Sequence, residues 1–178
     1  METMRKSIDL NNSIINWKAF KTGGGHHGTL KFKSGEIEIT ENVPSGGEFV
    51  FDMNSIYDID QIGILKTKLI EDLESERFFD TKQYPDSSFK ITSVDHVADD
   101  KGYYAVSGNL TIKGVTNEIA FKAEFSISDN DVFNIQTAVI GVDRTKWGIT
   151  FGAKGFLKKL ESHIIANVFD VTANVVTQ

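Results

Sequence analysis

The chain contains no cysteine among its 178 residues and no long uncharged apolar run. The absence of cysteine excludes a disulfide scaffold, a thiolate metal site and a cysteine nucleophile. No stretch approaches the roughly 18 apolar residues that a membrane-spanning helix requires, so we expect no integral membrane segment. Met1–Leu10 also lacks the apolar core of a signal peptide. We therefore expect a periplasmic or otherwise extracytoplasmic protein if a signal peptide was trimmed, and a cytoplasmic one if not.

Acidic residues outnumber basic ones, 25 to 19. The net charge is -6, the sequence pI is about 5.2, and the densest basic stretch, residues 154–159, holds only three lysines. This balance argues against nucleic acid as a partner, and against an anionic membrane bound over a broad face.

Phenylalanine, in contrast, is abundant, with 13 residues spread along the chain. A chain of this length fits one domain, and we expect residues 1–178 to form it. Such a domain buries enough surface for a sizeable core. The fold must therefore contain a large aromatic interior or an aromatic-lined cavity.

Apolar side chains recur at every second position over most of the chain, which is the signature of half-buried strands. The segments with this pattern are 13–20, 29–40, 47–56, 104–112, 119–127, 133–139 and 163–176. We expect Ser34–Gly35 to form a turn between two short strands, and Gly114–Val115 to join the two longest ones in a hairpin. Many strands with regular turns predict an all-β fold, a closed antiparallel barrel or a sandwich.

One segment has a different period. Within residues 61–77, Ile62, Leu65, Leu69 and Leu73 follow spacings of three and four, which predicts an amphipathic helix. We expect this helix to end before Pro85, where extended backbone is required.

Catalytic and metal motifs are weak. The glycine-rich stretch 23–28 lacks the features of a phosphate loop and is interpreted as a barrel-rim loop. His26 and His27 point to opposite faces of an extended segment, so we expect no metal site there. No nucleophile elbow is present. We predict no cofactor and no enzymatic activity; a weaker alternative is an enzyme with His26 or His163 as base.

The inward positions of the predicted strands carry large apolar side chains. They are Trp17, Phe32, Phe49, Phe51, Phe89, Leu110, Phe121, Phe125 and Phe133. This pattern leaves two interpretations open, a filled core and a ligand-lined lumen.

Three motifs carry a resemblance to a known family. Gly108–Thr116 reads GNLTIKGVT, Phe78–Phe89 reads FFDTKQYPDSSF, and Asp143–Ile149 reads DRTKWGI. In sequence, order and spacing these stretches resemble the YceI-like family of polyisoprenoid-binding, lipocalin-like proteins. The resemblance covers the chain from about Ile8 to Val176.

The resemblance implies an eight-stranded antiparallel barrel whose lumen takes a long isoprenoid lipid of polyprenyl or quinone type, for binding, carriage or storage. The nine inward residues above would then line the ligand site, together with Arg144 and Trp147 of the third motif. Arg144 is a candidate partner for an anionic headgroup; its alternative role is a structural one. The rival hypothesis is a ligand-free barrel acting as an interaction or stress-related module. Whether the chain forms a homodimer is open.

The chain departs from the family pattern at two places. Ile70–Arg77 reads IEDLESER where many members have an R-D-x-H-L motif, and Asp9–Ser13 reads DLNNS where they have D-x-x-H-S. The polar roles of those family histidines therefore do not transfer to this chain.

Overall fold

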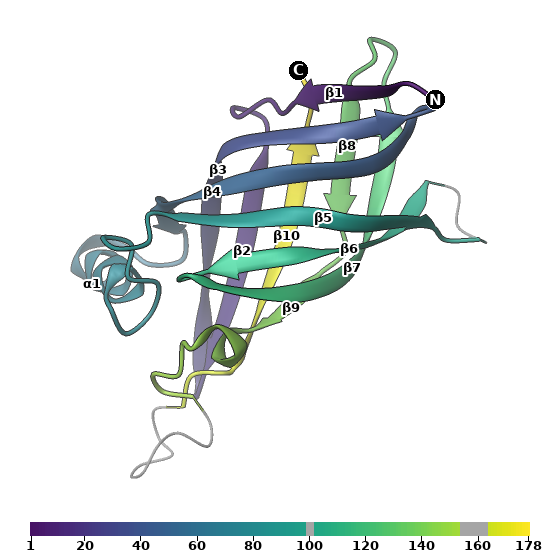
Figure 1. The fold of residues 1–178 in the computed structure, drawn as a ribbon. Coiled ribbons are helices and arrows are strands. Elements are labelled where there is room, and N and C mark those ends of the chain that lie inside the picture. The colour runs from purple at the N-terminus through teal and green to yellow at the C-terminus, as the bar shows by residue number, and fades with distance from the viewer. Residues whose placement is uncertain (99–101, 154–163) are drawn as a thin grey trace.

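The computed structural model describes residues 1–98, 102–153 and 164–178. Eight strands close into an antiparallel barrel (Figure 1), and around it they follow the order β3, β2, β10, β8, β7, β6, β5, β4, with β4 pairing again with β3. The barrel strands are β2 (Ile14–Lys21), β3 (Gly24–Thr40), β4 (Val43–Asp58), β5 (Asp86–His96), β6 (Tyr103–Ile112), β7 (Val115–Ile127), β8 (Phe133–Thr137) and β10 (Val168–Val176). The predicted all-β, lipocalin-like barrel is confirmed.

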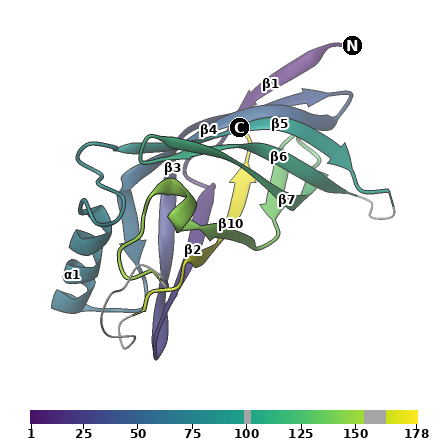
Figure 2. The same cartoon turned by 60° about the horizontal axis from the view of Figure 1, so that its bottom comes forward.

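Four further elements lie within the described residues. Strand β1 (Thr3–Ser7) pairs with the far end of β3, and β9 (Ile140–Asp143) pairs with β10. Helix α1 (Gly63–Glu74) lies beside the barrel at one end, and the 3-10 helix η1 (Arg144–Trp147) follows β9 (Figures 1 and 2). None of the helices in these residue ranges is long and apolar enough to cross a membrane.

The β6–β7 hairpin shows how local chemistry forms the wall. Lys113 and Gly114 both have positive φ, 51° and 74°, which is the two-residue turn whose twist matches that of the paired strands. From this turn the register runs without interruption from Ile112 opposite Val115 to Tyr103 opposite Glu124. The predicted hairpin is present, with Lys113 and Gly114 as its turn residues.

Two predicted loops are strands. Ser34–Gly35 is not a turn: β3 continues through it, with a register shift between Phe32 and Ser34 that bends the strand. The absence of a side chain at Gly35 lets the strand bend closely over its neighbours, since a Cβ there would lie 2.7 Å from Ile8 Cδ1. The glycine-rich stretch is likewise not a loop, because β3 begins at Gly24 and pairs with β2.

The helix prediction was too long at both ends. Helix α1 covers Gly63–Glu74 rather than residues 61–77. It ends at Glu74, well before Pro85, and the backbone N–H and hydroxyl of the C-cap residue Ser75 both donate to the carbonyl of Asp72. Only half of the predicted apolar stripe packs on the barrel. Leu69 and Leu73 face the barrel interior, whereas Ile62 and Leu65 are exposed.

Candidate functional site

The barrel encloses an apolar lumen with a cavity volume of about 410 Å³, within the range of small-molecule pockets, roughly 300–1,000 Å³. Its wall draws on all eight barrel strands and on helix α1. The polar side chains among the lining residues are few: Lys21, His26, Asp72, Ser87, Tyr104, Thr137 and Arg144. A space of this kind favours a ligand that needs apolar contact along most of its length.

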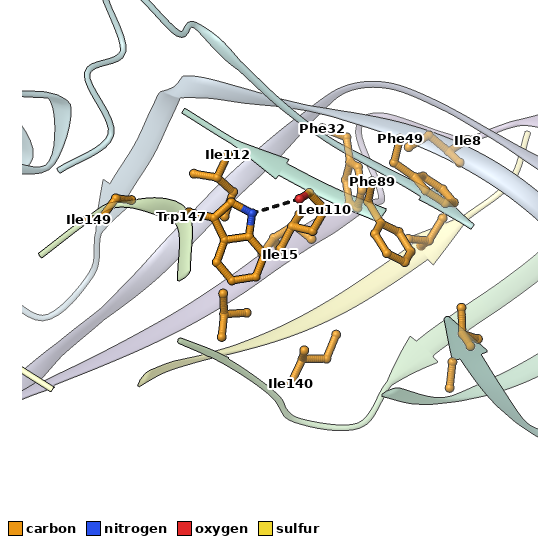
Figure 3. Packing of buried hydrophobic residues seen from close by; sticks show 14 of the residues in the cluster. Ile8, Ile15, Phe32, Phe49, Phe89, Leu110, Ile112, Ile140, Trp147 and Ile149 are labelled. Carbon is orange, nitrogen blue, oxygen red and sulfur yellow. Dashed lines mark hydrogen bonds between the residues drawn. The ribbon is translucent and has the colours of Figure 1, made fainter. Parts of the chain in front are cut away.

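Aromatic rings line the wall and pack against one another in pairs. Phe32 packs against Phe49 and Phe51 with ring centroids 6.1 and 5.5 Å apart, and Phe89 packs against Phe121 at 5.5 Å. These separations are typical of favourable aromatic pairs. Figure 3 shows Phe32, Phe49 and Phe89 grouped on one side of the interior. The strand alternation alone had placed these side chains inward.

Nine of the eleven predicted site residues line the lumen. They are Trp17, Phe32, Phe49, Phe51, Phe89, Leu110, Phe121, Phe125 and Arg144. Phe133 and Trp147 are buried nearby without lining it. That any of these residues binds a ligand stays a prediction.

Trp147 lies beside the wall. Its indole N–H donates to the carbonyl of Leu110 at 2.9 Å, and Ile112 and Ile149 lie beside it (Figure 3). It is only 2% exposed. This contact fixes η1 against the end of β6. The sequence motif Asp143–Ile149 therefore packs directly on the motif Gly108–Thr116.

Arg144 is 4% exposed and is held by main-chain carbonyls. Its Nε donates to Ala166, its Nη1 to Ile149 and Phe151, and its Nη2 to Ile165, at 2.8–3.1 Å. Four of the five guanidinium N–H groups are therefore engaged in joining two chain segments. This geometry favours the structural alternative for Arg144 over the headgroup role.

One end of the lumen is sealed by a small apolar cluster. Phe133 stacks on Phe125 with centroids 5.4 Å apart, and Ile37 and Ile39 complete the cluster, each 1% exposed. Lys6 covers it from β1, with Nζ 5.2 Å from the centre of the Phe133 ring. Strand β1 therefore closes this end of the barrel.

The other end opens at helix α1. Phe20 and Phe151 both line the lumen and are 37% and 43% exposed, so the apolar wall reaches the surface there. Leu69 and Leu73 of α1 border the same opening, and Phe78 packs edge-on against Phe151 at 5.6 Å. The mouth therefore lies between the β2–β3 hairpin, α1 and residues 148–153 after η1.

A polar network that sequence reasoning missed stands at this mouth. Asp60 accepts at Oδ2 from His26 Nδ1 over 2.9 Å and at Oδ1 from the His27 backbone N–H over 3.0 Å. Asp58, fully buried, hydrogen-bonds to Asp60 and accepts from the backbone N–H groups of Asp60 and Gln61. The network ties the start of the α1 connection to the barrel rim; its only sequence signal is the Asp-x-Asp pair ending a strand.

The network divides charge unevenly between its two carboxyl groups. Burial, with the hydrogen bond and charge of Asp60, raises the pKa of Asp58, whereas the hydrogen bond to Asp58 and then that to His26 lower the pKa of Asp60. Donor atoms of His26, Asp58 and Asp60 lie within 4.8 Å of one another. Asp60 is therefore the anion that faces His26, and Asp58 the group that retains a proton more readily.

A closed eight-stranded barrel with an apolar lumen open at one end defines a lipocalin-like β-barrel protein. Residues 7–177 match the family model of the YceI-like domain, and the chain belongs to that family.

Curated relatives carry no functional name. A UPF0312 protein of Pseudomonas putida strain F1 is 28% identical over 145 residues, which cover 81% of this chain and 72% of the relative. The UPF0312 protein VPA0850 of Vibrio parahaemolyticus is 33% identical over 93 residues, 48% of each chain.

Solved structures share the fold. BcnA of Burkholderia cenocepacia has a TM-score of 0.77 at 17% identity, covering 96% of this chain and 99% of that one. A polyisoprenoid binding domain from Saccharophagus degradans has a TM-score of 0.70 at 17% identity, covering 99% of both chains. At these identities the likeness extends to the barrel architecture alone.

Proposed function

We propose that this protein binds a long isoprenoid lipid, of polyprenyl or quinone type, in the barrel lumen and carries or stores it without chemical change. The observation that carries the proposal is the aromatic-lined lumen, sealed by the Phe133 cluster and open at α1. Each CH₂ group buried there contributes about 0.8 kcal/mol, so a chain of many carbons binds tightly even after it loses conformational freedom. The polyisoprenoid binding domain of Saccharophagus degradans, with the same fold, supports this ligand class.

The contacts of His26, one of the two candidate bases, favour binding over catalysis. The ring of His26 contacts Asp60 and the Gln61 amide, whose nitrogen lies 2.7 Å from Nδ1, so it serves the rim network. His163, the other candidate base, lies outside the described residues. The rival ligand-free barrel requires a filled core, which the cavity disfavours.

The experiment begins with native mass spectrometry of the purified protein, followed by organic extraction and lipid analysis. A stoichiometric isoprenoid is the expected result. Delipidated protein is then offered a polyprenyl lipid and a quinone. The proposal would be overturned if the protein purifies without lipid and binds neither added lipid although its fold is intact.

A matched pair of variants localises the site. Phe121→Asp places a charge in the lumen and is expected to abolish uptake, because an unpaired carboxylate in an apolar cavity is strongly disfavoured. Ala120→Asp places the same charge on the outer face of the same strand, where the side chain is exposed, and is expected to leave uptake unchanged. Equal uptake by two folded variants would place the ligand elsewhere.

A further inference from the structure

Four aliphatic side chains are exposed together where the chain passes from β4 into α1. Ile59, Ile62, Ile64 and Leu65 are 52%, 82%, 70% and 62% exposed, and Tyr57 beside them is 53% exposed. We call these five residues the rim patch. Scattered exposed apolar side chains need no explanation, but five within nine residues, four aliphatic and one aromatic, form a group that marks an interaction surface.

Helix stability does not account for this composition. Ile62 occupies the N-cap position, where it makes no side-chain cap bond, and the first turn of α1 carries no acidic residue. The lysines, Lys66 and Lys68, lie in the first half of the helix, and the acids Glu71, Asp72 and Glu74 lie in the second half. This is the reverse of the arrangement that the helix dipole favours. A different requirement therefore governs this end of the helix.

The rim patch is continuous with the mouth of the lumen. Helix α1 lines the lumen with Leu69 and Leu73, one and two turns after Leu65. The Ile59 backbone N–H donates to the carbonyl of His27, which joins the patch to the β2–β3 hairpin. Figure 2 shows the start of α1 and the tip of this hairpin at the same end of the barrel. A surface that contacts the rim patch therefore also meets the mouth.

Lysines surround the apolar side chains. Lys66 Nζ lies 4.4 Å from the centre of the Tyr57 ring and 3.0 Å from its hydroxyl, and Lys18 Nζ lies 5.4 Å from the centre of the Phe20 ring. Lys68 and Lys21 are exposed nearby. Aliphatic and aromatic side chains flanked by lysines match the layered chemistry of a bilayer surface, apolar below and phosphate above.

Two acidic groups at this end have partners within the protein, whereas Glu71 of α1 is exposed. Asp60 is bonded to His26, and Asp72 pairs with Arg77. The net charge of -6 argues against a broad anionic-membrane face, but the exposed lysines Lys18, Lys21 and Lys68 give positive charge to the end of the barrel that carries the exposed aliphatics.

We propose that the rim patch and the neighbouring lysines dock the open end of the barrel on a phospholipid bilayer, so that an apolar ligand passes between membrane and lumen without crossing water. This inference rests on the proposed function for the nature of the cargo. The docking itself depends only on the patch.

The test uses a double variant that removes apolar side chains from the patch without weakening the helix. Ile62→Asp supplies a favoured N-cap residue and Ile64→Glu places an acid in the first turn, so the helix gains stability while the patch loses its apolar character. Val139→Glu is the control, because Val139 is 64% exposed but lies between β8 and β9, outside the patch. Co-sedimentation is measured with vesicles of phosphatidylcholine, with and without phosphatidylglycerol.

Wild type and Val139→Glu are expected to bind the vesicles, more tightly with phosphatidylglycerol, and the double variant about tenfold more weakly or not at all. Equal vesicle binding by wild type and double variant, or none by wild type, overturns the proposal. If wild type self-associates without vesicles and the double variant is monomeric, the patch is an interface between copies instead.

A second measurement separates docking from the proposed function. Loading with a polyprenyl lipid delivered from ethanol is expected to be equal in all three proteins, whereas extraction of the same lipid from vesicles fails only in the double variant. Vesicle binding by a wild type that loads no lipid from ethanol would refute the proposed function and leave docking standing.

Discussion

Gly108 lies directly beneath the ring of Phe89 on the inner face of the barrel. A Cβ at position 108 would stand 2.5 Å from Phe89 Cζ and 2.5 Å from the carbonyl oxygen of Lys90. The missing side chain therefore sets both the position of an aromatic wall residue and the spacing of β5 and β6.

Gly108→Ala is expected to lower the free energy of unfolding by about 1–3 kcal/mol, because the new methyl group meets a backbone oxygen that cannot move without displacing a strand. Ligand capacity should fall as well, since the Phe89 ring must shift into the lumen. Gly24→Ala is the control, because nothing lies within 4 Å of a Cβ there. Urea unfolding and ligand titration measure both effects; equal stability of the two variants contradicts the prediction.

The two tryptophans are expected to report differently on the ligand. Trp17 lines the lumen, whereas Trp147 is buried beside it with its indole bonded to Leu110. In Trp147→Phe, whose sole tryptophan is Trp17, ligand addition should change the fluorescence strongly. In Trp17→Phe the change should be small. A larger response from Trp147 would place the ligand at the η1 end of the barrel.

Arg144→Lys separates the two roles of Arg144. The lysine retains the charge but cannot reach four carbonyl groups at once, so the free energy of unfolding should fall by about 3 kcal/mol or more. Preference between lipids with and without an anionic headgroup should stay the same. Unchanged stability with a lost preference for anionic headgroups would establish the headgroup role instead.

The Asp58–Asp60 pair predicts a stability maximum on the acid side of neutrality. The lowered pKa of Asp60 makes stability rise as pH increases towards 3.8, since the unfolded chain there binds more protons. The raised pKa of Asp58 makes stability fall as pH increases above 3.8, since the folded chain there binds more protons. Each slope is at most about 1.4 kcal/mol per pH unit.

Single substitutions test the two slopes. Asp58→Asn is expected to remove the fall above pH 3.8, and Asp60→Asn to remove the rise below it and to lessen the fall above it, because Asp60 contributes to the raised pKa of Asp58. The measurement is urea unfolding across pH. A profile of Asp58→Asn that still falls as in wild type would show that another group is responsible.

Strand-forming residues and their inward faces were predictable because alternation is a local property. Phe121 and Phe125 point inward in any sheet that buries one face of β7, and the strand pattern therefore identified most of the lumen wall. The helix was also recognisable from its period. Its ends were not, because the carbonyl of Asp72 is taken by Ser75, and this competition depends on side-chain geometry rather than on the apolar spacing.

Contacts between distant segments were beyond sequence reasoning. Asp58 and His26 lie 32 positions apart and meet only because β3 and β4 pair at the barrel rim. The chain through Ser34 and Gly35 remains a strand because it pairs with β4 on one side and the Gly35 carbonyl accepts from the Ile8 backbone N–H on the other, which outweighs the local preference of serine and glycine for a turn.

The sequence by itself determined which side chains face inward, the presence of helix α1 and the family. Only the tertiary structure decided that the inward side chains leave a cavity rather than fill the barrel, that the Phe133 end is sealed, and that the α1 end is open beside exposed aliphatics. The physical reason is that cavity volume is the difference between the space that eight paired strands enclose and the total volume of their inward side chains. Strand pairing and closure set that space globally, and no local stretch of sequence contains it.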